Sequence, residues 1–369
     1  MSDTIQYPQR WAGMNVALAH DWLTGMRGGE NVLELLCNGF QAAPIYTLIH
    51  NRPSVSVAIN SHPLQTSWLN SLPGIYESYR NMLPMFPSAI RSMKLEKTDL
   101  LISTSHCVAK GIGRPQGGKH VCYCFTPMRY AWLFHDEYFG RNPAKRILIA
   151  PMLSWLRRWD RKSSDGVDHF IAISEHVRQR IQLFYNRDAD VVFPPVDTLY
   201  YTPESERSGD FDLIVSALVP YKRIDLAVRT YTRMGWPLKV VGIGGDLDKL
   251  RELAGPNVEF LQWQSREAIR ELYRDCRCLV FPGEEDFGIV PVEAQACGAP
   301  VLAFARGGAL ETVRRDISGI FFDAQTEESL SEGVQRLAAR SWDSSAIRTH
   351  AESFSAQRFI NDLDACLPG

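Results

Sequence analysis

The sequence has no apolar segment long enough to cross a membrane and no Cys-x-x-Cys pair. A membrane-spanning helix needs about 20 consecutive apolar residues, and no part of the 369-residue chain approaches this length. Residues 1–10 are polar and lack the apolar core of a signal peptide. We therefore predict that the eight cysteines are reduced, mostly buried thiols of a cytosolic protein that hold no metal ion.

Net charge is also small, at -2, and gives no indication of nucleic-acid binding. The charge is uneven, because residues 1–194 hold 21 Lys+Arg and 15 Asp+Glu (+6), whereas residues 195–369 hold 19 and 27 (-8). The 45% hydrophobic content and the length indicate a globular protein of two domains with different surfaces. A basic first half could lie on anionic lipid head groups.

Strand and helix signals alternate along both halves, which predicts a doubly wound α/β fold for each. After a loose polar leader (1–13), the first domain is expected at 14–194. Pro194-Pro195 is a stiff break, and the second domain is expected at 195–350. Residues 351–367 have apolar residues at helical spacing and predict one terminal helix. Strands are expected at 14–20, 43–49, 100–103, 120–124, 169–174, 190–193, 211–216, 237–241, 258–261, 278–281, 301–304 and 319–322.

Two glutamates, Glu285 and Glu293, form the most informative pair. They lie between the predicted strands 278–281 and 301–304, with a short helix that Pro291 suits in its first turn and Gly298 ends. Glu285 would lie on the loop outside the strand's carboxyl end, where parallel sheets bind ligands. Glu293 would lie in the first turn of the helix and face the same site. Each of the two carboxylates can bind a vicinal diol. In the alternative interpretation, Glu293 only interacts favourably with the helix dipole and Glu285 is a solvated loop charge.

The segment Glu285-Asp-Phe287-Gly288-Ile289-Val-Pro-Val-Glu293 resembles the E-x7-E signature of the retaining glycosyltransferases of family four, with Asp286 for a glycine and the proline shifted by one. The resemblance implies the GT-B fold, in which two Rossmann-like doubly wound domains face one another across a cleft. It further implies that residues 351–369 cross back to the first domain. Glu285 and the Gly288-Ile289 segment would position the donor sugar, and Glu293 would bind the ribose.

A second segment, Ser216-Ala-Leu-Val-Pro-Tyr-Lys222-Arg223, resembles the family's G-R-L-x-x-x-K-G run. Lys222 takes the lysine's place and could neutralise a diphosphate leaving group without a metal. Ala217 stands where the family has an arginine, and Arg223 is the candidate substitute. The Asp246-Leu-Asp248 triplet is interpreted as a helix start rather than a metal site, so no metal or other cofactor is predicted.

The nucleotide is expected near two further strand ends. Gly242 and Gly244 end a strand, where glycine lets the backbone approach a ligand closely. Trp263 is the last residue of the segment 260–263, which resembles the base-binding part of the family. An ordinary strand end is the alternative in both places. The spacing does not match G-x-G-x-x-G, since Leu247 holds the third position, and this argues against an NAD-binding dehydrogenase.

Acceptor-side residues are expected in the first domain. Gly28 and Gly29 precede a helix and resemble the family's glycine-rich acceptor loop, with a tight turn as the alternative. Arg129 lies in a segment where many family members carry His-Thr-Pro, but Phe125 replaces that histidine. His106, at a strand end, is the candidate that would act in its place, with His20 as a second; a structural histidine is the alternative.

Two stretches, 79–86 and 145–159, mix basic and bulky apolar residues, including Arg146, Arg157, Trp155 and Trp159, with Arg161 just beyond. They predict either peripheral contact with an anionic membrane at the inner face of the cell membrane or ordinary amphipathic packing.

The predicted function is hexose transfer, with mannose from GDP-mannose favoured by the resemblance to bacterial polysaccharide enzymes, onto a lipid-linked or saccharide acceptor. The alternative is a non-transferring sugar-nucleotide protein, either an epimerase on the same fold or an inactive regulatory subunit, and Ala217 and Phe125 favour the inactive subunit.

Overall fold

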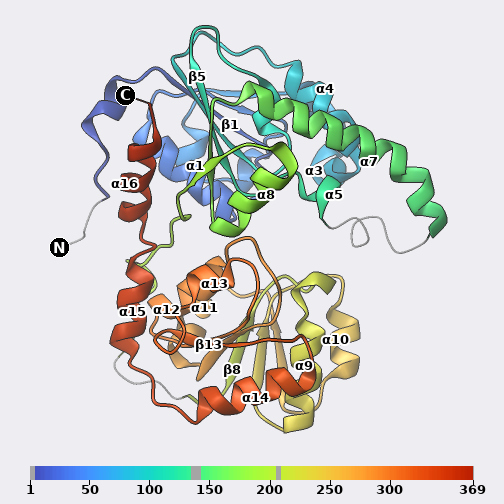
Figure 1. The fold of residues 1–369 in the computed structure, drawn as a ribbon, viewed down its shortest axis with the longest axis vertical. Helices are drawn as coiled ribbons and strands as arrows, with labels where there is room; N and C mark the ends of the chain where they lie inside the picture. The colour runs from blue at the N-terminus through green and yellow to red at the C-terminus, as the bar shows by residue number, and fades with distance from the viewer. Residues whose placement is uncertain (1–4, 134–142, 205–208, 369) are drawn as a thin grey trace. The chain divides into compact units, whose positions relative to one another are not determined.

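The chain folds into two compact units, each built on its own sheet. The structure is a computed structural model that describes residues 5–133, 143–204 and 209–368. The first unit comprises Thr4–Pro194 together with Phe359–Gly369, and the second comprises Pro195–Arg358. Figure 1 shows each unit as a sheet with helices around it.

Within the described residues, seven parallel strands form the sheet of the first unit, in the order β3-β2-β1-β4-β5-β6-β7. The strands are β1 Val16–His20, β2 Ile45–Thr47, β3 Leu64–Thr66, β4 Leu100–Ser105, β5 Lys119–Cys124, β6 His169–Ala172 and β7 Ala189–Val191. Every residue of β1, β2 and β4 is buried, as expected for a parallel sheet that is covered on both faces. The strand order reverses direction between β1 and β4, which confirms the predicted doubly wound topology.

Helices of the first unit connect these strands. They are α1 Gly28–Gly39, α2 Val57–Asn60, α3 Ile75–Ser78, α4 Phe86–Arg91, α5 Arg129–Trp132, α7 Pro143–Ser163, α8 Glu175–Tyr185 and most of α16 Ala356–Cys366, with the 3₁₀ turns η1 Gln9–Gly13, η2 Arg52–Ser54, η3 Trp68–Ser71, η4 Tyr79–Met85, η5 Ala109–Ile112 and η6 Ser164–Gly166. The Ser174 side chain caps α8 by accepting a hydrogen bond from the N–H of Val177.

The second unit repeats the arrangement with six parallel strands among its described residues, in the order β10-β9-β8-β11-β12-β13. Its strands are β8 Asp212–Val215, β9 Leu238–Val241, β10 Val258–Gln262, β11 Cys278–Phe281, β12 Val301–Phe304 and β13 Gly319–Phe322. Its helices are η7 Pro220–Lys222, α9 Ile224–Met234, α10 Leu247–Leu253, α11 Arg266–Asp275, α12 Ile289–Ala296, α13 Ala309–Thr312, α14 Glu327–Ala338 and α15 Ser344–Glu352. The strands are parallel, so their carboxyl ends meet at one edge of the sheet.

Most predicted strands lie within one or two residues of the observed ones, but three expectations were wrong. The leader is not loose throughout, because η1 carries Trp11, which is buried and stacks on Phe40 at a ring-centroid distance of 4.3 Å. The strand β3 was missed, because its three residues are only partly buried or exposed and give no apolar run. The predicted terminal helix over 351–367 is observed as α16, but it begins only at Ala356, because α15 ends at Glu352 and Ser353–Ser355 separate the two helices.

All eight cysteines are free, and seven of them are buried, whereas Cys366 is partly exposed. This agrees with the prediction of reduced, mostly buried thiols. None of the helices in the described part of the chain is long and apolar enough to cross a membrane.

Candidate functional site

Lys222 and Glu285 come together at the carboxyl edge of the second sheet. Lys222 ends the turn η7, which follows β8, and Glu285 lies on the loop after β11. Their side chains form an ion pair between Nζ and Oε1, and the lysine ammonium also lies 5.2 Å from the centroid of the Tyr221 ring. The structure therefore joins two residues that were predicted from separate motifs 63 positions apart.

Three glycines let the backbones around this pair pack closely. A Cβ at Gly283 would lie 2.9 Å from the Cα of Lys222, and a Cβ at Gly308 would lie 2.3 Å from the Cα of Phe287. The N–H of Gly308 donates to the carbonyl of Glu285 at 2.8 Å, and Gly307 has a φ of +63°. None of these three glycines is among the predicted site residues. The signal for two of them was the glycine pair that follows a predicted buried strand.

Helix α12 begins directly after the Glu285 loop. Its N-cap is Gly288, with a φ of +93°, and Ile289 is its first residue, so the free amides of its first turn lie where the sugar-positioning segment was predicted. Phe287 is different, because its side chain is buried and its ring lies 5.8 Å from that of Phe354. The structure thus places the Phe287 side chain among the buried residues of the second unit.

Glu293 lies in the second turn of α12 and not in the first turn as predicted, because the helix already begins at Ile289. Its Oε2 accepts a hydrogen bond from the hydroxyl of Tyr273 at 3.0 Å. Burial raises the pKa of the Glu293 carboxyl to about 7, and the hydrogen bonds from Tyr273 and Tyr201 and the charge of Arg266 offset only part of this effect.

Arg223, the candidate second cation, is already paired. Its Nη1 donates to Gln325 Oε1 at 2.9 Å and its Nε lies 3.3 Å from Asp225 Oδ1. Its backbone has a φ of +54°, a conformation that few residues other than glycine adopt. The side chain is therefore engaged with α9 and with the segment before α14.

Gly242 and Gly244 lie in close contact with the backbone of a neighbouring loop. A Cβ at Gly242 would lie 1.8 Å from the carbonyl oxygen of Ser216, and one at Gly244 would lie 2.2 Å from that of Leu218. They pack the loop after β9 against the loop after β8. For these two glycines the structure therefore supports the alternative interpretation, an ordinary strand end. Trp263 follows β10 and is 71% exposed.

In the first unit, His106 pairs with a buried carboxylate that the sequence analysis did not single out. Asp21 accepts hydrogen bonds from the four successive backbone N–H groups of residues 106–109, at 2.6–3.0 Å. His106 Nδ1 lies 3.0 Å from Asp21 Oδ2, and its side chain is 30% exposed. Burial alone would raise the pKa of Asp21, but His106 and these hydrogen bonds outweigh it and hold the pKa below its usual range.

His20 lies at the end of β1, beside the start of α1. Its Nδ1 is 2.7 Å from Thr104 Oγ1, and its Nε2 is 3.9 Å from Glu30 Oε1. Helix α1 begins at Gly28, and a Cβ at Gly29 would lie 3.3 Å from the Phe125 ring and 3.5 Å from His20 Cε1. Gly29 and His20 therefore lie close to Phe125, whose ring centroid lies 6.4 Å from that of His106.

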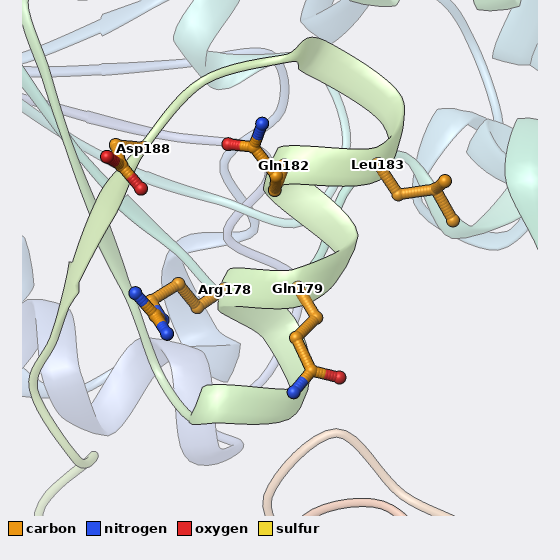
Figure 2. Close-up of a pocket in the computed structure, with 5 residues that line it drawn as sticks. All are labelled: Arg178, Gln179, Gln182, Leu183 and Asp188. Atoms are coloured by element: carbon orange, nitrogen blue, oxygen red, sulfur yellow. The ribbon is translucent and has the colours of Figure 1, made fainter.

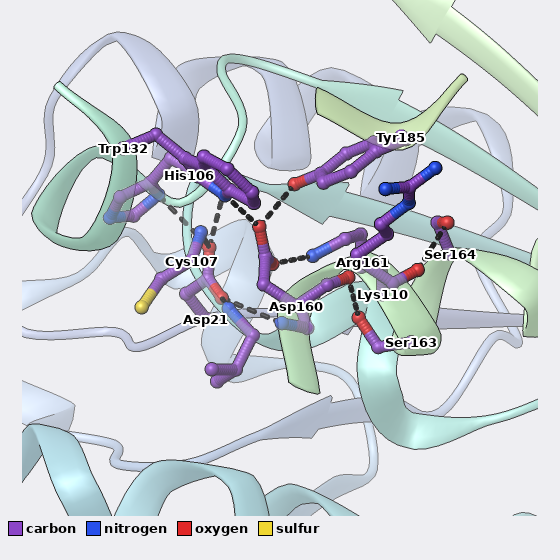
Figure 3. A network of polar contacts seen from close by, with 12 residues as sticks. Asp21, His106, Cys107, Lys110, Trp132, Asp160, Arg161, Ser163, Ser164 and Tyr185 are labelled. Atoms are coloured by element: carbon purple, nitrogen blue, oxygen red, sulfur yellow. Dashed lines mark hydrogen bonds and ion pairs between the residues drawn. The ribbon is translucent and has the colours of Figure 1, made fainter. Parts of the chain in front are cut away.

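Figure 3 shows a buried polar network next to this cluster. Lys110 is buried and forms an ion pair with Asp160, whose Oδ2 accepts hydrogen bonds from Trp132 Nε1 and the Tyr185 hydroxyl, both at 2.8 Å. Burial alone would lower the pKa of Lys110, but Asp160 outweighs it and raises the pKa. Arg129, the remaining acceptor candidate, begins helix α5, which Trp132 ends. The network thus ties η5, α5, α7 and α8 together.

A surface pocket on α8 takes no part in these clusters. Figure 2 shows its lining residues along the helix and the loop after it, namely Arg178, Gln179, Gln182, Leu183 and Asp188. None of them is a predicted site residue. Among the described residues, no group of three or more His, Cys, Asp or Glu side chains is arranged to hold a metal ion.

Part of the chain is similar to a known family of proteins. Residues 206–353 match the family model described as "Glycosyl transferases group 1". The D-inositol 3-phosphate glycosyltransferase of Mycobacteroides abscessus is 31% identical over 218 residues, which cover 52% of this chain and 49% of that protein. The chain thus spans about half the length of the curated relatives it matches.

Two solved structures are similar over nearly the whole chain. The lipopolysaccharide outer core galactosyltransferase WaaB has a TM-score of 0.68 at 15% identity, covering 96% of this chain and 99% of that one. The Anabaena protein Alr3699/HepE, solved in complex with UDP, has a TM-score of 0.69 at 16% identity, covering 95% and 98%. At this identity the likeness shows the fold, and it confirms the predicted GT-B fold.

Proposed function

We propose that the protein is a retaining glycosyltransferase of family four that transfers a hexose from a nucleotide diphosphate sugar to an acceptor hydroxyl. The observation that carries this proposal is the Lys222–Glu285 pair at the carboxyl edge of the second sheet. It lies inside the segment that matches the group 1 glycosyl transferases. A cation and a carboxylate at that position suit the two halves of such a donor, the diphosphate and the sugar.

Five of the predicted site residues in the second unit have a chemical role in this proposal. Lys222 stabilises the negative charge that grows on the departing diphosphate. Glu285 accepts hydrogen bonds from sugar hydroxyls, and the free amides at Gly288 and Ile289 help to position the sugar. Glu293 binds the ribose diol. The side chains of Arg223 and Phe287 are assigned no contact, because each is engaged within the protein.

In the first unit, we assign the acceptor to the predicted residues Gly28, Gly29, His106 and Arg129. The carboxylate of Asp21 holds His106 through Nδ1, so the opposite ring nitrogen can bond a hydroxyl. Phe125 occupies the place of the family's histidine, and His106 lies next to it. The acceptor we favour is a saccharide or a lipid-linked saccharide.

The sugar and the base are the finer part of the proposal. Resemblance to bacterial polysaccharide enzymes favours mannose from GDP-mannose, whereas one structural neighbour is solved with UDP. The test is a thermal-shift screen with GDP-mannose, UDP-glucose and UDP-galactose, each against its free nucleoside diphosphate. A ligand at 100 times its Kd stabilises a folded protein by about 2.7 kcal/mol. A screen in which none of these compounds raises the Tm would refute the proposal.

A peripheral membrane contact at the inner face of the cell membrane is proposed on a smaller surface than the sequence suggested. Trp159 is buried, and Arg157 donates to the carbonyl of Ala131 at 2.7 Å. Trp155 is 42% exposed, and several neighbours on α7 are exposed as well: Ile147, Leu148, Arg158, Arg161 and Lys162. The side chain of Arg146 lies outside the described residues. The stretch at 79–86 contributes little, because Tyr79, Leu83 and Phe86 are buried.

The alternative of a non-transferring protein rests on Ala217 and Phe125, which replace a family arginine and a family histidine. Donor hydrolysis by the purified protein without acceptor separates the two functions. Slow release of free hexose supports a transferase, and binding without any hydrolysis or transfer supports an inactive subunit.

A further inference from the structure

In the structure, Lys222 and Glu285 are paired with each other, although the proposed function requires both side chains to bind the nucleotide diphosphate sugar. We infer that this pair makes the site select the intact donor over the nucleoside diphosphate that remains after transfer. The inference rests on the proposed function of the same site. It assigns Glu285 a second role, as the residue that determines specificity for donor against product.

The surroundings of the pair restrict how the two charges can separate. The side chains of Lys222 and Glu285 are 14% and 24% exposed, so water stabilises each separated charge only in part. The backbone of Lys222 packs against Gly283, and that of Glu285 packs against Gly307 and is bonded by Gly308. Since both backbones are held, the pair can open only by rotation of the two side chains.

The cation next to Lys222 in the sequence does not replace it in the pair. The nearest candidate in sequence, Arg223, is engaged with Asp225 and Gln325. A carboxylate at Glu285 that loses Lys222 therefore needs hydrogen-bond donors from a ligand. A sugar supplies such donors, because each of its hydroxyl groups can donate to a carboxylate oxygen.

The two ligands differ in what they offer to the separated pair. With the intact donor, the diphosphate binds Lys222 while sugar hydroxyls bind Glu285, so both charges gain a partner. With the nucleoside diphosphate, only Lys222 gains a partner, and Glu285 is left next to phosphate anions. An unpaired, partly desolvated carboxylate is costly, and like charges repel. The product should therefore bind more weakly than the donor, which favours its release after transfer.

The experiment measures binding by calorimetry without acceptor, using GDP, GDP-mannose, UDP and UDP-glucose. In the wild-type protein the preferred intact donor should bind about tenfold more tightly than its diphosphate, which corresponds to about 1.4 kcal/mol. Glu285→Gln removes the competing charge but keeps the shape of the side chain. It should raise the affinity for the diphosphate about tenfold and bring the two affinities close together.

Glu284→Gln is the matched control, because Glu284 is the exposed neighbour and its replacement removes the same charge from the same loop. It should change the affinities for donor and diphosphate by equal factors. A Glu285→Gln protein whose preference equals that of Glu284→Gln would overturn the inference. So would a wild-type protein that binds the diphosphate more tightly than the donor.

Lys222→Gln tests the same inference from the other side of the pair. In the wild-type protein, Lys222 gains the diphosphate as a partner but loses Glu285. These two changes cancel in the binding free energy unless sugar hydroxyls take the place of Lys222 as partners of Glu285. The variant should therefore lose about tenfold in donor affinity but less than about threefold in diphosphate affinity. Equal losses would contradict the inference. If the wild-type protein binds none of the four compounds, the proposed function fails instead.

Discussion

Replacing Lys110 by methionine should destabilise the first unit strongly, although no proposed ligand contact involves this residue. Lys110 and Asp160 are both buried, and the ammonium lies 5.0 Å from the centroid of the Tyr185 ring and 5.9 Å from that of Trp159. Methionine preserves much of the side-chain length and apolar contact but removes the charge. Lys110→Met therefore leaves a buried carboxylate without its cation.

The size of the effect follows from the remaining partners of Asp160. Removing one member of a buried ion pair costs about 3–5 kcal/mol. Asp160 keeps its hydrogen bonds from Trp132 and Tyr185, so we expect the lower end, about 3 kcal/mol. For a unit of this size, this corresponds to a decrease in Tm of about 6–12 °C.

The assay is urea unfolding followed by tryptophan fluorescence, because Trp132 and Trp159 lie beside the pair. Lys119→Met is the control, since Lys119 is 65% exposed and lies 3.9 Å from Asp168. An exposed pair contributes at most about 1 kcal/mol. The pKa of Lys110 is raised, so its contribution is complete below the unfolded lysine pKa and is lost only as the pH rises through the higher folded value. The difference between the variants should therefore be constant from about pH 7 to 9.

Two results would refute this reasoning. One is a Lys110→Met protein that unfolds at the same urea concentration as Lys119→Met. The other is a double variant, Lys110→Met with Asp160→Asn, that is less stable than Lys110→Met alone, because asparagine removes the unpaired charge while its oxygen still accepts a hydrogen bond.

Four further outcomes are expected. Lys222→Ala should lower kcat by about 10²–10³-fold while nucleoside binding stays nearly unchanged, because the lysine acts on charge that grows in the transition state; wild-type turnover would remove it from the mechanism. Transfer should survive EDTA, and an activity lost on chelation and restored by magnesium or manganese would contradict the metal-free role of Lys222. The pKa of Glu293 is raised from 4.5 to about 7, so the native state binds more protons than the unfolded state between these pH values, and stability falls as the pH rises through them. Glu293→Gln should remove this decline in stability, measured by urea titrations at pH 5 and 7. An unchanged decline would show that another group causes it. Binding to anionic liposomes should weaken as salt rises and after Trp155→Ala or Arg158→Glu, whereas co-sedimentation that is indifferent to lipid charge, salt and these changes would exclude the α7 surface.

The sequence predicted best what depends on local pattern. The strands β11 and β12 were placed at their observed bounds, because each is a short apolar run between turn residues. The meeting of Lys222 and Glu285 was predictable as well. Both follow strands of one parallel sheet, and the carboxyl ends of such strands share an edge.

The sequence could not reveal partners that are distant along the chain. The carboxylate of Asp21 lies 85 residues before His106, and Asp160 lies 50 residues after Lys110. No spacing rule connects such residues, because the fold alone brings them together. Gly242 and Gly244 show the related difficulty, since a glycine required by a neighbouring backbone looks the same in sequence as one required by a ligand.

The first unit is assembled from two separate stretches of the chain. Helix α16 contributes Phe359, Ile360 and Leu363 as buried residues, and Asp364 accepts hydrogen bonds from Arg10 and Trp11. The ribosome makes residues 195–358 between these two stretches. During synthesis, therefore, the second unit can complete its sheet before the first unit receives its last helix. Until α16 is synthesised, the apolar surface that it covers in the first unit stays exposed, and a chaperone that protects nascent chains would bind there.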